Sequence, residues 1–293
     1  MKVLITGGNG LLGRELCTQW VGTWDITSLV HRDVEEPIDG VTYVVADLAG
    51  SLDYSTLPSE VDVVIHLAQS SRFRDFPDGA RDTFQVNVAS TLNLLEYSRL
   101  VGVRQFFLAS TGGVYENQSG AITESGALIP PSRIGLYFAS KLSAEMIAST
   151  YRSCFEVSVL RFFFMYGPRQ RPDMFLPRLV HRVLEGEPLQ IDDGGGIRVN
   201  PIHVSDAARL FGRLIGQTAP QVLNVAGPEV ASIREIGETI GRLSGRNVIW
   251  EIGGSSIDIV ADVTSMSEFL VGSEMMPLYR GLQELVEVAL DLH

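Results

Sequence analysis

A tyrosine and a lysine four residues apart, Tyr137 and Lys141, are the side chains of this 293-residue sequence whose types and spacing best fit catalysis. Residues four apart lie on one face of a helix. An ammonium group near a phenol stabilises the phenolate and lowers the tyrosine pKa, which suits proton exchange with a substrate hydroxyl or carbonyl near neutral pH. The alternative is a solvated lysine beside a packed tyrosine, because this spacing also occurs by chance in many helices.

A hydroxyl group is expected close to this pair. The apolar stretch Gln105–Ala109 predicts a strand, and the sequence Ser110-Thr111-Gly112-Gly113 follows it. In open parallel sheets, ligands bind outside the carboxyl ends of the strands. We therefore predict that Thr111 holds the same substrate oxygen as Tyr137.

Three glycines near the amino terminus, Gly7, Gly10 and Gly13, stand between an apolar run and an amphipathic stretch. Their spacing lets the chain turn sharply, brings backbone N–H groups against a pyrophosphate and packs a new helix closely on the preceding strand. The amino terminus of that helix also attracts an anion. An ordinary turn between a strand and a helix is the alternative, but the flanking elements favour a dinucleotide site.

The end of the second predicted strand, Asp25–Val30, bears on the choice of coenzyme. An acidic residue at this point accepts hydrogen bonds from the adenosine ribose, whereas an arginine favours a 2′-phosphate. His31 stands where the acid would be and Arg32 follows it. NADP(H) is therefore favoured over NAD(H), unless Asp33 turns into the acidic role.

The next two predicted strands lie at 41–46 and 61–68. The first delivers Asp47 and Leu48, a carboxylate and an apolar side chain placed to meet the edge and face of an adenine. The second is a continuous apolar run, as expected for a strand covered on both faces. His66 lies inside it, and we interpret it as a core histidine with satisfied hydrogen bonds.

The alternation of strands and helical segments predicts the fold class. It indicates an α/β protein with a Rossmann-type, doubly wound parallel sheet and a smaller C-terminal substrate-binding lobe. We expect the Rossmann domain at residues 1–165, with 200–226 returning to it. Residues 166–199 and 227–293 form most of the lobe, because proline, arginine and glycine become frequent after residue 165.

Composition narrows the classes of partner. The net charge of −12 argues against binding to nucleic acid, and no apolar run approaches the roughly 20 residues that a membrane span needs. Cys17 and Cys154 have neither metal-binding nor CxxC spacing, so we expect reduced thiols and no metal. Strand-forming residues begin at Lys2, which leaves no room for a signal peptide, and a cytoplasmic protein is expected.

The glycine loop together with Asp47, Asn87, Thr111 and Tyr137-xxx-Lys141 resembles the extended short-chain dehydrogenase/reductases, the NAD(P)-dependent epimerase/dehydratase family. The similarity continues through residues 160–168 and 203–206. The resemblance implies that Thr111, Tyr137 and Lys141 are the catalytic trio and that Asn87 supports them. It also implies a homodimer, formed through the helices around Asn87 and Tyr137.

Further site residues complete this prediction. The resemblance implies that Phe163 and Tyr166 belong to the nicotinamide and substrate region. Additional substrate contacts are expected from Phe164, Arg171 and Arg198. Additional dinucleotide contacts are expected from apolar and amide side chains near the strand ends, namely Leu11, Leu12, Leu67, Ala68 and Gln69.

Departures from the family pattern narrow the reaction. Members that are nucleotide-sugar 4,6-dehydratases carry Asp-Glu directly after the catalytic threonine, as acid and base. This chain has Gly112 and Gly113 there, so proton removal for dehydration has no evident base. A 4,6-dehydratase is therefore disfavoured.

Other departures concern the expected diphosphate contacts. Phe164 stands where the family usually has asparagine, and Val199-Asn200 stands where it usually has Arg-Asp, with Arg198 displaced by one position. The substrate is held differently, through Arg198, Arg169 or Arg171, or it lacks a diphosphate.

The sequence thus predicts an NAD(P)-dependent oxidoreductase or epimerase that transfers a hydride to or from a carbinol or keto carbon. We expect a nucleotide-linked sugar as substrate, with a 4-ketoreductase or a 4-epimerase as the activity; Arg32 favours the reductase. A reductase of a non-nucleotide ketone is one alternative, favoured by Phe164. A dinucleotide-sensing protein without turnover is another, disfavoured because Thr111, Tyr137 and Lys141 are all present.

Overall fold

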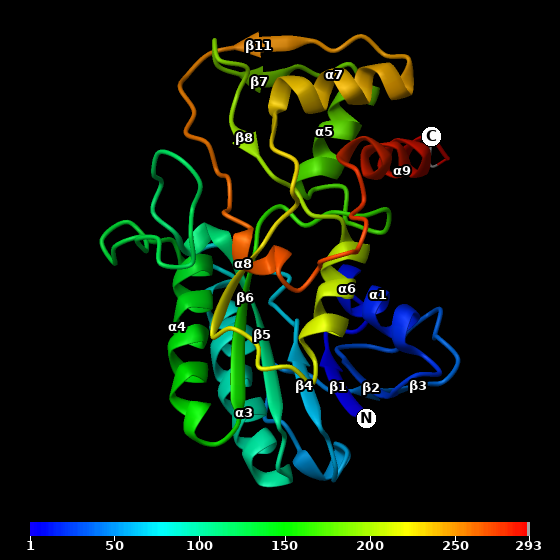
Figure 1. Ribbon diagram of the computed structural model, residues 1–293, viewed down its shortest axis with the longest axis vertical. Helices are drawn as coiled ribbons and strands as arrows, with labels where there is room; N and C mark the ends of the chain where they lie inside the picture. Colours follow the sequence, from blue (N-terminus) through cyan, green and yellow to red (C-terminus); the bar gives the residue numbers. More distant parts are fainter. Residues whose placement is uncertain (292–293) are drawn as a thin grey trace. The chain divides into compact units, whose positions relative to one another are not determined.

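A seven-stranded sheet is the framework of the protein, which is described here over residues 1–291 of a computed structural model (Figure 1). Neighbouring strands from β3 to β5 run parallel. The spatial order is that of a doubly wound sheet, in which chain order reverses at β1. Its strands are β3 (Val41–Val45), β2 (Asp25–Val30), β1 (Lys2–Thr6), β4 (Val63–His66), β5 (Gln105–Thr111), β6 (Glu156–Phe162) and β9 (Val222–Val225).

Helices or helical turns connect consecutive strands of the parallel sheet, except between β2 and β3. Helix α1 buries Leu12, Leu16 and Trp20, the apolar face that its sequence predicts. The helices and helical turns that precede β6 are α1 (Leu11–Trp20), η1 (Tyr54–Thr56), α2 (Ala80–Phe84), η2 (Gln85–Ala89), α3 (Ser90–Val101), η3 (Gly112–Val114), α4 (Leu136–Thr150) and η4 (Tyr151–Ser153).

The chain divides into two compact units. The first consists of residues 1–114, 128–161 and 211–223. Its strands β4 and β5 are buried almost throughout, and α3 and α4 contact each other beside them. Apolar side chains such as Leu4, Val64, Leu94 and Phe106 form its core.

The second unit consists of residues 115–127, 162–210 and 224 onward. Helices α5, α7 and α9 bury apolar stripes in a core that includes Leu179, Ile236 and Leu282. A capping box of Ser232 and Glu235 begins α7. The second unit contains α5 (Phe175–Leu184), β7 (Leu189–Ile191), β8 (Arg198–Val199), β10 (Ala231–Ser232), α7 (Ile233–Ser244), β11 (Trp250–Ile252), α8 (Thr264–Ser267) and α9 (Leu278–Asp291). Helix α6 (Val204–Leu214) contributes residues to both units.

The assignment of a substrate-binding role to 166–199 and 227–293 stays a prediction. Across residues 1–291, none of the helices combines the length and the apolar character needed to cross a lipid bilayer.

Candidate active site

The glycine loop folds back on itself between β1 and α1. Gly7 has a φ of +71°, in the left-handed region that glycine adopts freely. The Gly10 N–H donates a hydrogen bond to the Gly7 carbonyl oxygen at 2.9 Å. A Cβ on Gly13 would lie 2.3 Å from that same oxygen, so α1 approaches the loop this closely only with glycine there. The sharp turn predicted from the glycine spacing is therefore present, and α1 packs closely on this loop.

The first turn of α1, which contains Leu11, Leu12 and Gly13, is suited to an anion. Gly10 is its N-cap, and within residues 1–291 no side chain caps this helix and no acidic residue lies in its first turn. The first N–H groups of a helix have no partner within the helix, and the helix dipole favours negative charge there. These residues fit the pyrophosphate of a dinucleotide.

The predicted adenosine end lies where β2 and β3 finish side by side. His31 Nδ1 is 3.6 Å from Asp47 Oδ1, and both side chains are exposed. Asp47 also accepts a hydrogen bond from the Ala49 N–H at 2.9 Å. Arg32 is exposed and Leu48 is buried. Neighbouring parallel strands thus bring His31 and Asp47 together.

Tyr137 lies in the first turn of α4 and meets two predicted site residues. Its phenol donates a hydrogen bond to Gln69 Oε1 at 3.1 Å and also hydrogen-bonds with Thr111. Burial raises the pKa of Tyr137 to about 12, while the Arg74 charge and the Thr111 hydrogen bond act in the opposite direction. The structure therefore brings Gln69, Thr111 and Tyr137 together.

Lys141 lies one turn further along α4 and is buried. Its Nζ donates a hydrogen bond to the Ala109 carbonyl oxygen at 3.1 Å. Burial lowers the pKa of Lys141 to about 8, and the nearby Glu145 carboxylate opposes this shift. The sequence-based expectation that Lys141 lowers the pKa of Tyr137 is corrected here: desolvation of the phenol dominates, and the ammonium is directed at a backbone carbonyl.

Asn87 faces inward from the π-helical turn η2. Its Oδ1 accepts a hydrogen bond from the Ser70 N–H at 2.9 Å, and its Nδ2 donates to Ser140 Oγ at 2.9 Å. Ser140 Oγ in turn donates to the Tyr137 carbonyl oxygen at 2.7 Å. Asn87 thus joins the loop after β4 to the first turn of α4.

Sequence reasoning missed two residues in the loop after β4. The rings of Phe73 and Tyr137 pack with centroids 4.7 Å apart, at 44°. The Arg74 guanidinium lies 4.9 Å from the Phe73 ring centroid, at a cation–π distance. A loop has no periodicity of apolar residues from which this contact could be predicted. The only signal in the sequence was the local run Arg72-Phe73-Arg74.

Sequence reasoning also missed a buried ion pair. Arg161 on β6 binds Glu145 on α4 through two hydrogen bonds, Nε to Oε1 at 3.1 Å and Nη2 to Oε2 at 2.6 Å. The Glu145 carboxylate also accepts a hydrogen bond from Ser110 Oγ. The sequence contained a signal for this ion pair. Tyr137, Lys141 and Glu145 follow one another at intervals of four residues, which places all three on one face of α4, and Arg161 is a charged residue within a mostly apolar strand.

The remaining predicted residues lie in the second unit. Phe163 is buried and stacks on Tyr115, with centroids 6.1 Å apart. Phe164 adopts a positive φ of 46°, which is uncommon outside glycine, and its ring packs on Phe175. Tyr166 is only 1% exposed and meets the His203 ring edge to face. The tyrosine that the resemblance places at the substrate thus packs within the core of this unit.

The two predicted substrate arginines are exposed. Arg171 forms a two-fold ion pair with Asp173, with N–O distances of 3.0 and 2.9 Å. Arg198 lies on β8, where its backbone N–H donates to Asp258 Oδ1.

A cavity of about 460 Å³ lies within the second unit, against α5 and β7. Arg178 and Arg182 line it from α5, and apolar side chains such as Leu179 and Ile233 complete its walls. Asp192 also lines it, but Ser256 and the N–H groups of Gly194 and Gly196 hold this carboxylate and lower its pKa to about 2. Cationic groups and apolar walls together suit a ligand that carries both phosphate and a ring.

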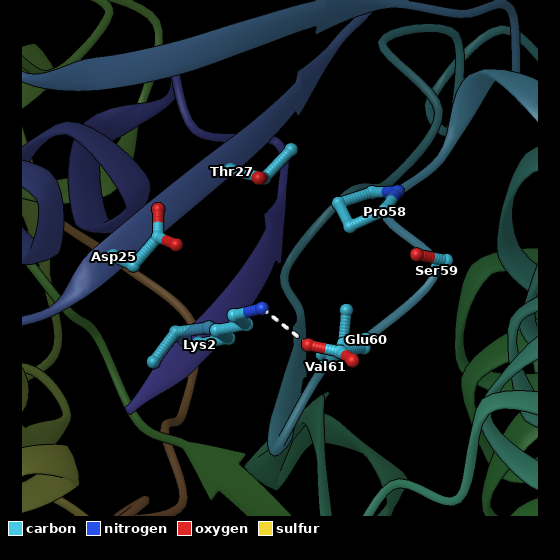
Figure 2. Close-up of a pocket in the computed structure, with 8 residues that line it drawn as sticks. Lys2, Asp25, Thr27, Pro58, Ser59, Glu60 and Val61 are labelled. Carbon is cyan, nitrogen blue, oxygen red and sulfur yellow. Dashed lines mark hydrogen bonds and ion pairs between the residues drawn. The ribbon is translucent and has the colours of Figure 1, made fainter.

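A smaller cavity of about 200 Å³ lies in the first unit, at the amino ends of β1 and β2. The glycine loop and His31 follow the carboxyl ends of these two strands. Figure 2 shows Lys2 reaching across it to Glu60, while Asp25 and Thr27 project from the neighbouring strand. None of the predicted site residues lines this cavity.

Comparison with known proteins identifies proteins that are similar to this chain over most of its length. The chain is 29% identical to an uncharacterized UDP-glucose epimerase, YtcB, of Bacillus subtilis, over 92% of each chain. It is also 29% identical to a UDP-glucuronate 4-epimerase of Thermodesulfobacterium geofontis, over 77% of this chain and 72% of that one. The crystal structure of UDP-glucuronic acid 4-epimerase from Bacillus cereus, in complex with UDP-glucuronic acid and NAD, superposes with a TM-score of 0.86 at 27% identity, over the full length of both chains.

A family model agrees as well. Residues 3–226, well over half of the sequence, match the model of the NAD dependent epimerase/dehydratase family. The resemblance inferred from the glycine loop and the Tyr137–Lys141 pair is thereby confirmed, and the chain belongs to the NAD dependent epimerase/dehydratase family.

Proposed function

We propose that this protein is an NAD(P)-dependent 4-epimerase of a UDP-linked sugar. The observation that carries the proposal is the contact of Tyr137 with Thr111 and Gln69 at the carboxyl end of β5. The relatives named above, which are UDP-glucose and UDP-glucuronate epimerases, support this substrate class.

Tyr137 exchanges the proton of the reacting oxygen. The dinucleotide, when bound, supplies the hydride acceptor and donor at its nicotinamide ring. Thr111 holds the substrate oxygen beside the phenol, and Tyr137 removes the proton when the carbinol is oxidised and returns it when the ketone is reduced. Because burial raises the pKa of Tyr137 to about 12, the phenol is poised as the acid, and it acts as the base only when positive charge approaches it.

The residues after Thr111 argue against dehydration. Gly112 and Gly113 carry no ionisable group, and a Cβ on Gly113 would lie 2.2 Å from the Phe138 ring, so a larger side chain does not fit there. The oxidised sugar therefore meets no acid–base pair at these positions and is reduced again, which is the outcome expected of an epimerase.

The cavity of the second unit is the proposed site for the nucleotide part of the substrate. Arg178 and Arg182 would bind the diphosphate, and the apolar wall would contact the base. These arginines come from a helix, whereas the family's usual asparagine and Arg-Asp contacts are replaced here by Phe164 and Val199-Asn200. Phe164, Arg171 and Arg198 stay predicted substrate contacts.

A 4-ketoreductase is the second candidate, and Arg32 is the observation that favours it. An exchangeable NADPH suits net reduction, whereas an epimerase retains its NAD between turnovers. The purified protein should be assayed for bound dinucleotide and titrated with NAD(H) and NADP(H). Tightly bound NAD together with interconversion of UDP-glucuronic acid or UDP-glucose and its 4-epimer supports the epimerase; exchangeable NADPH without interconversion supports the reductase. Turnover of neither sugar would shift the search to non-nucleotide ketones.

The role of Tyr137 is tested by Tyr137→Phe. We expect turnover to fall by ~10² or more, the scale of general acid–base catalysis, with dinucleotide binding nearly unchanged. Tyr151→Phe is the matched control, because its phenol hydrogen-bonds Glu96 rather than a site residue. Unchanged turnover in Tyr137→Phe contradicts the proposed mechanism.

We also propose a homodimer in a reducing, cytoplasmic environment. Apolar side chains on α2, α3 and α4 are exposed, among them Phe84, Leu92 and Met146. The two cysteines are unpaired thiols. Light scattering of Met146→Glu against the unaltered protein tests the interface, since a charge there should shift the population toward monomer.

A further inference from the structure

His66, the last residue of β4, is buried among hydroxyl groups. Its Nδ1 lies 2.7 Å from Thr6 Oγ1, and its Nε2 lies 3.0 Å from Thr91 Oγ1. A second hydroxyl, Ser90 Oγ, lies 3.5 Å from Nε2. Burial, reinforced by the charge of Lys141, lowers the pKa of His66 to about 3, so the ring is neutral between pH 5 and 8.

The partners fix which ring nitrogen carries the proton. Thr91 Oγ1 donates its one hydrogen to the Asn87 carbonyl oxygen at 2.8 Å, and Ser90 Oγ donates to the Val86 carbonyl oxygen at 2.6 Å. Both hydroxyls can therefore only accept from the imidazole, so Nε2 carries the hydrogen. In a neutral ring, Nδ1 is then an acceptor, and it receives the Thr6 hydroxyl hydrogen.

This proton arrangement extends to the segment Ala68–Ser70. Because Thr6 Oγ1 donates to His66, it accepts at its remaining lone pairs, where the Ala68 N–H reaches it at 3.1 Å. At the other end of the segment, the Ser70 N–H is held by Asn87 Oδ1 at 2.9 Å. Between these two anchors stands Gln69, which accepts the hydrogen bond of the Tyr137 phenol.

The segment Ala68–Ser70 also packs against the glycine loop. A Cβ on Gly7 would lie 3.0 Å from the Ala68 nitrogen, so the loop that would bind the pyrophosphate packs directly against it. A displacement of Ala68 would therefore move both the glycine loop and the partner of Tyr137.

We propose that His66 is a positioning residue whose Nε2–H tautomer, held by Thr6 and Thr91, fixes the segment Ala68–Ser70 between the glycine loop and the phenol of Tyr137. His66 acts through this segment and does not exchange a proton with the substrate. The effect on turnover rests on the proposed function, whereas the tautomer and the effect on dinucleotide binding do not.

The tautomer is tested directly by ¹⁵N NMR of histidine-labelled protein, with His66→Gln used to assign the signal. We expect His66 to show a protonated Nε2 and an unprotonated Nδ1, unchanged from pH 5.5 to 8. A protonated Nδ1, or titration of His66 within that range, overturns the proposal.

The positioning effect is tested by Thr91→Val, which keeps the shape of the side chain and removes its hydroxyl, against Thr91→Ser, which keeps the hydroxyl. A lost buried hydrogen bond predicts about tenfold weaker NAD(H) binding and about tenfold lower kcat in Thr91→Val, with recovery in Thr91→Ser. Lower thermal stability with unchanged NAD(H) binding and kcat would show a purely structural role and overturn the proposal. If no sugar substrate is found, the NMR and NAD(H) results still decide the matter.

Discussion

Two groups of buried polar side chains in the first unit differ in charge. The neutral group joins β1, β4 and η2 to α3, and consists of Thr6, His66, Asn87 and Thr91. The charged group joins β5 and β6 to α4, and consists of Ser110, Lys141, Glu145 and Arg161. Both groups pack beside proposed catalytic residues, but only the second keeps ionised groups out of water.

This difference in charge identifies the proposed catalytic residue whose burial lowers the stability of the fold. A buried neutral group needs only hydrogen-bond partners, whereas a buried charge also needs an opposite charge. Glu145 and Arg161 compensate each other through two hydrogen bonds. Lys141 hydrogen-bonds only a backbone carbonyl among its described contacts, and burial lowers its pKa to about 8. The proposed catalytic cation is therefore the least compensated member of the charged group.

The largest predicted effect comes from breaking the compensated pair. Arg161→Met leaves the Glu145 carboxylate buried with Ser110 as its remaining described hydrogen-bond donor. We expect the free energy of unfolding to fall by about 3–5 kcal/mol, measured by urea denaturation. The control is the double variant Arg161→Met with Glu145→Met, which removes both charges and should recover most of the loss. No recovery would show that shape, and not charge, decides stability here.

A smaller effect of opposite sign is predicted for Lys141, the least compensated charge of this group. Between pH 8 and 10.5 the unfolded chain binds a proton at Lys141 that the folded protein has released, so stability rises with pH in that window. Below pH 8 the folded protein bears the cost of burying the charge. Lys141→Met should therefore raise the free energy of unfolding at pH 7 by about 2 kcal/mol, after allowance for the lost hydrogen bond, and should abolish turnover.

The control for that prediction is pH itself. Near pH 10.5 the gain in the free energy of unfolding of Lys141→Met should disappear, because the lysine of the unaltered protein is then neutral when folded. A gain that persists at high pH would mean that the methionine merely packs better than the lysine stem.

The neutral group predicts a loss of stability in acid. Between pH 6.5 and 3 the unfolded chain protonates His66 and the folded protein does not, so stability falls as pH falls through this window. From pH 6.5 to 5.5 this accounts for about 1 kcal/mol of the free energy of unfolding. His66→Gln should remove that part of the pH dependence, measured as urea midpoints against pH, and Thr91→Ser should retain it.

Only part of the first unit could be predicted from the sequence. Parallel strands end at one edge, so the sequence correctly placed Thr111 near Tyr137, and it predicted Asp25–Val30 with its observed bounds. The helix expected around Asn87 is instead interrupted there by the π-helical turn η2. At this turn Asn87 forms hydrogen bonds with Ser70 and Ser140, which are distant in the sequence. The spacing of apolar residues within the helix carries no information about such contacts.

In the second unit the sequence offered less. Its strands are two or three residues long, so no shared strand edge predicts which side chains meet. Arg178 and Arg182 both line a cavity there. The spacing of two arginines four residues apart shows that they share a helix face, but it does not show whether that face is exposed to solvent or lines a cavity.

The smallest predicted effect belongs to the exposed ion pair Lys2–Glu60 (Figure 2). Its N–O distance of 2.5 Å is close to the 2.6 Å of Arg161–Glu145, but its side chains are 48% and 75% exposed, against 7% for each buried partner. Contact distance is thus nearly matched, and burial is the main difference. Water and salt screen the exposed charges, and either one is fully solvated when its partner is removed. Glu60→Gln should therefore leave the urea midpoint unchanged within error, at low and at high salt, where Arg161→Met shifts it strongly. A comparable shift in Glu60→Gln would break the comparison, because charge pairing alone, without burial, would then set the stability of both sites.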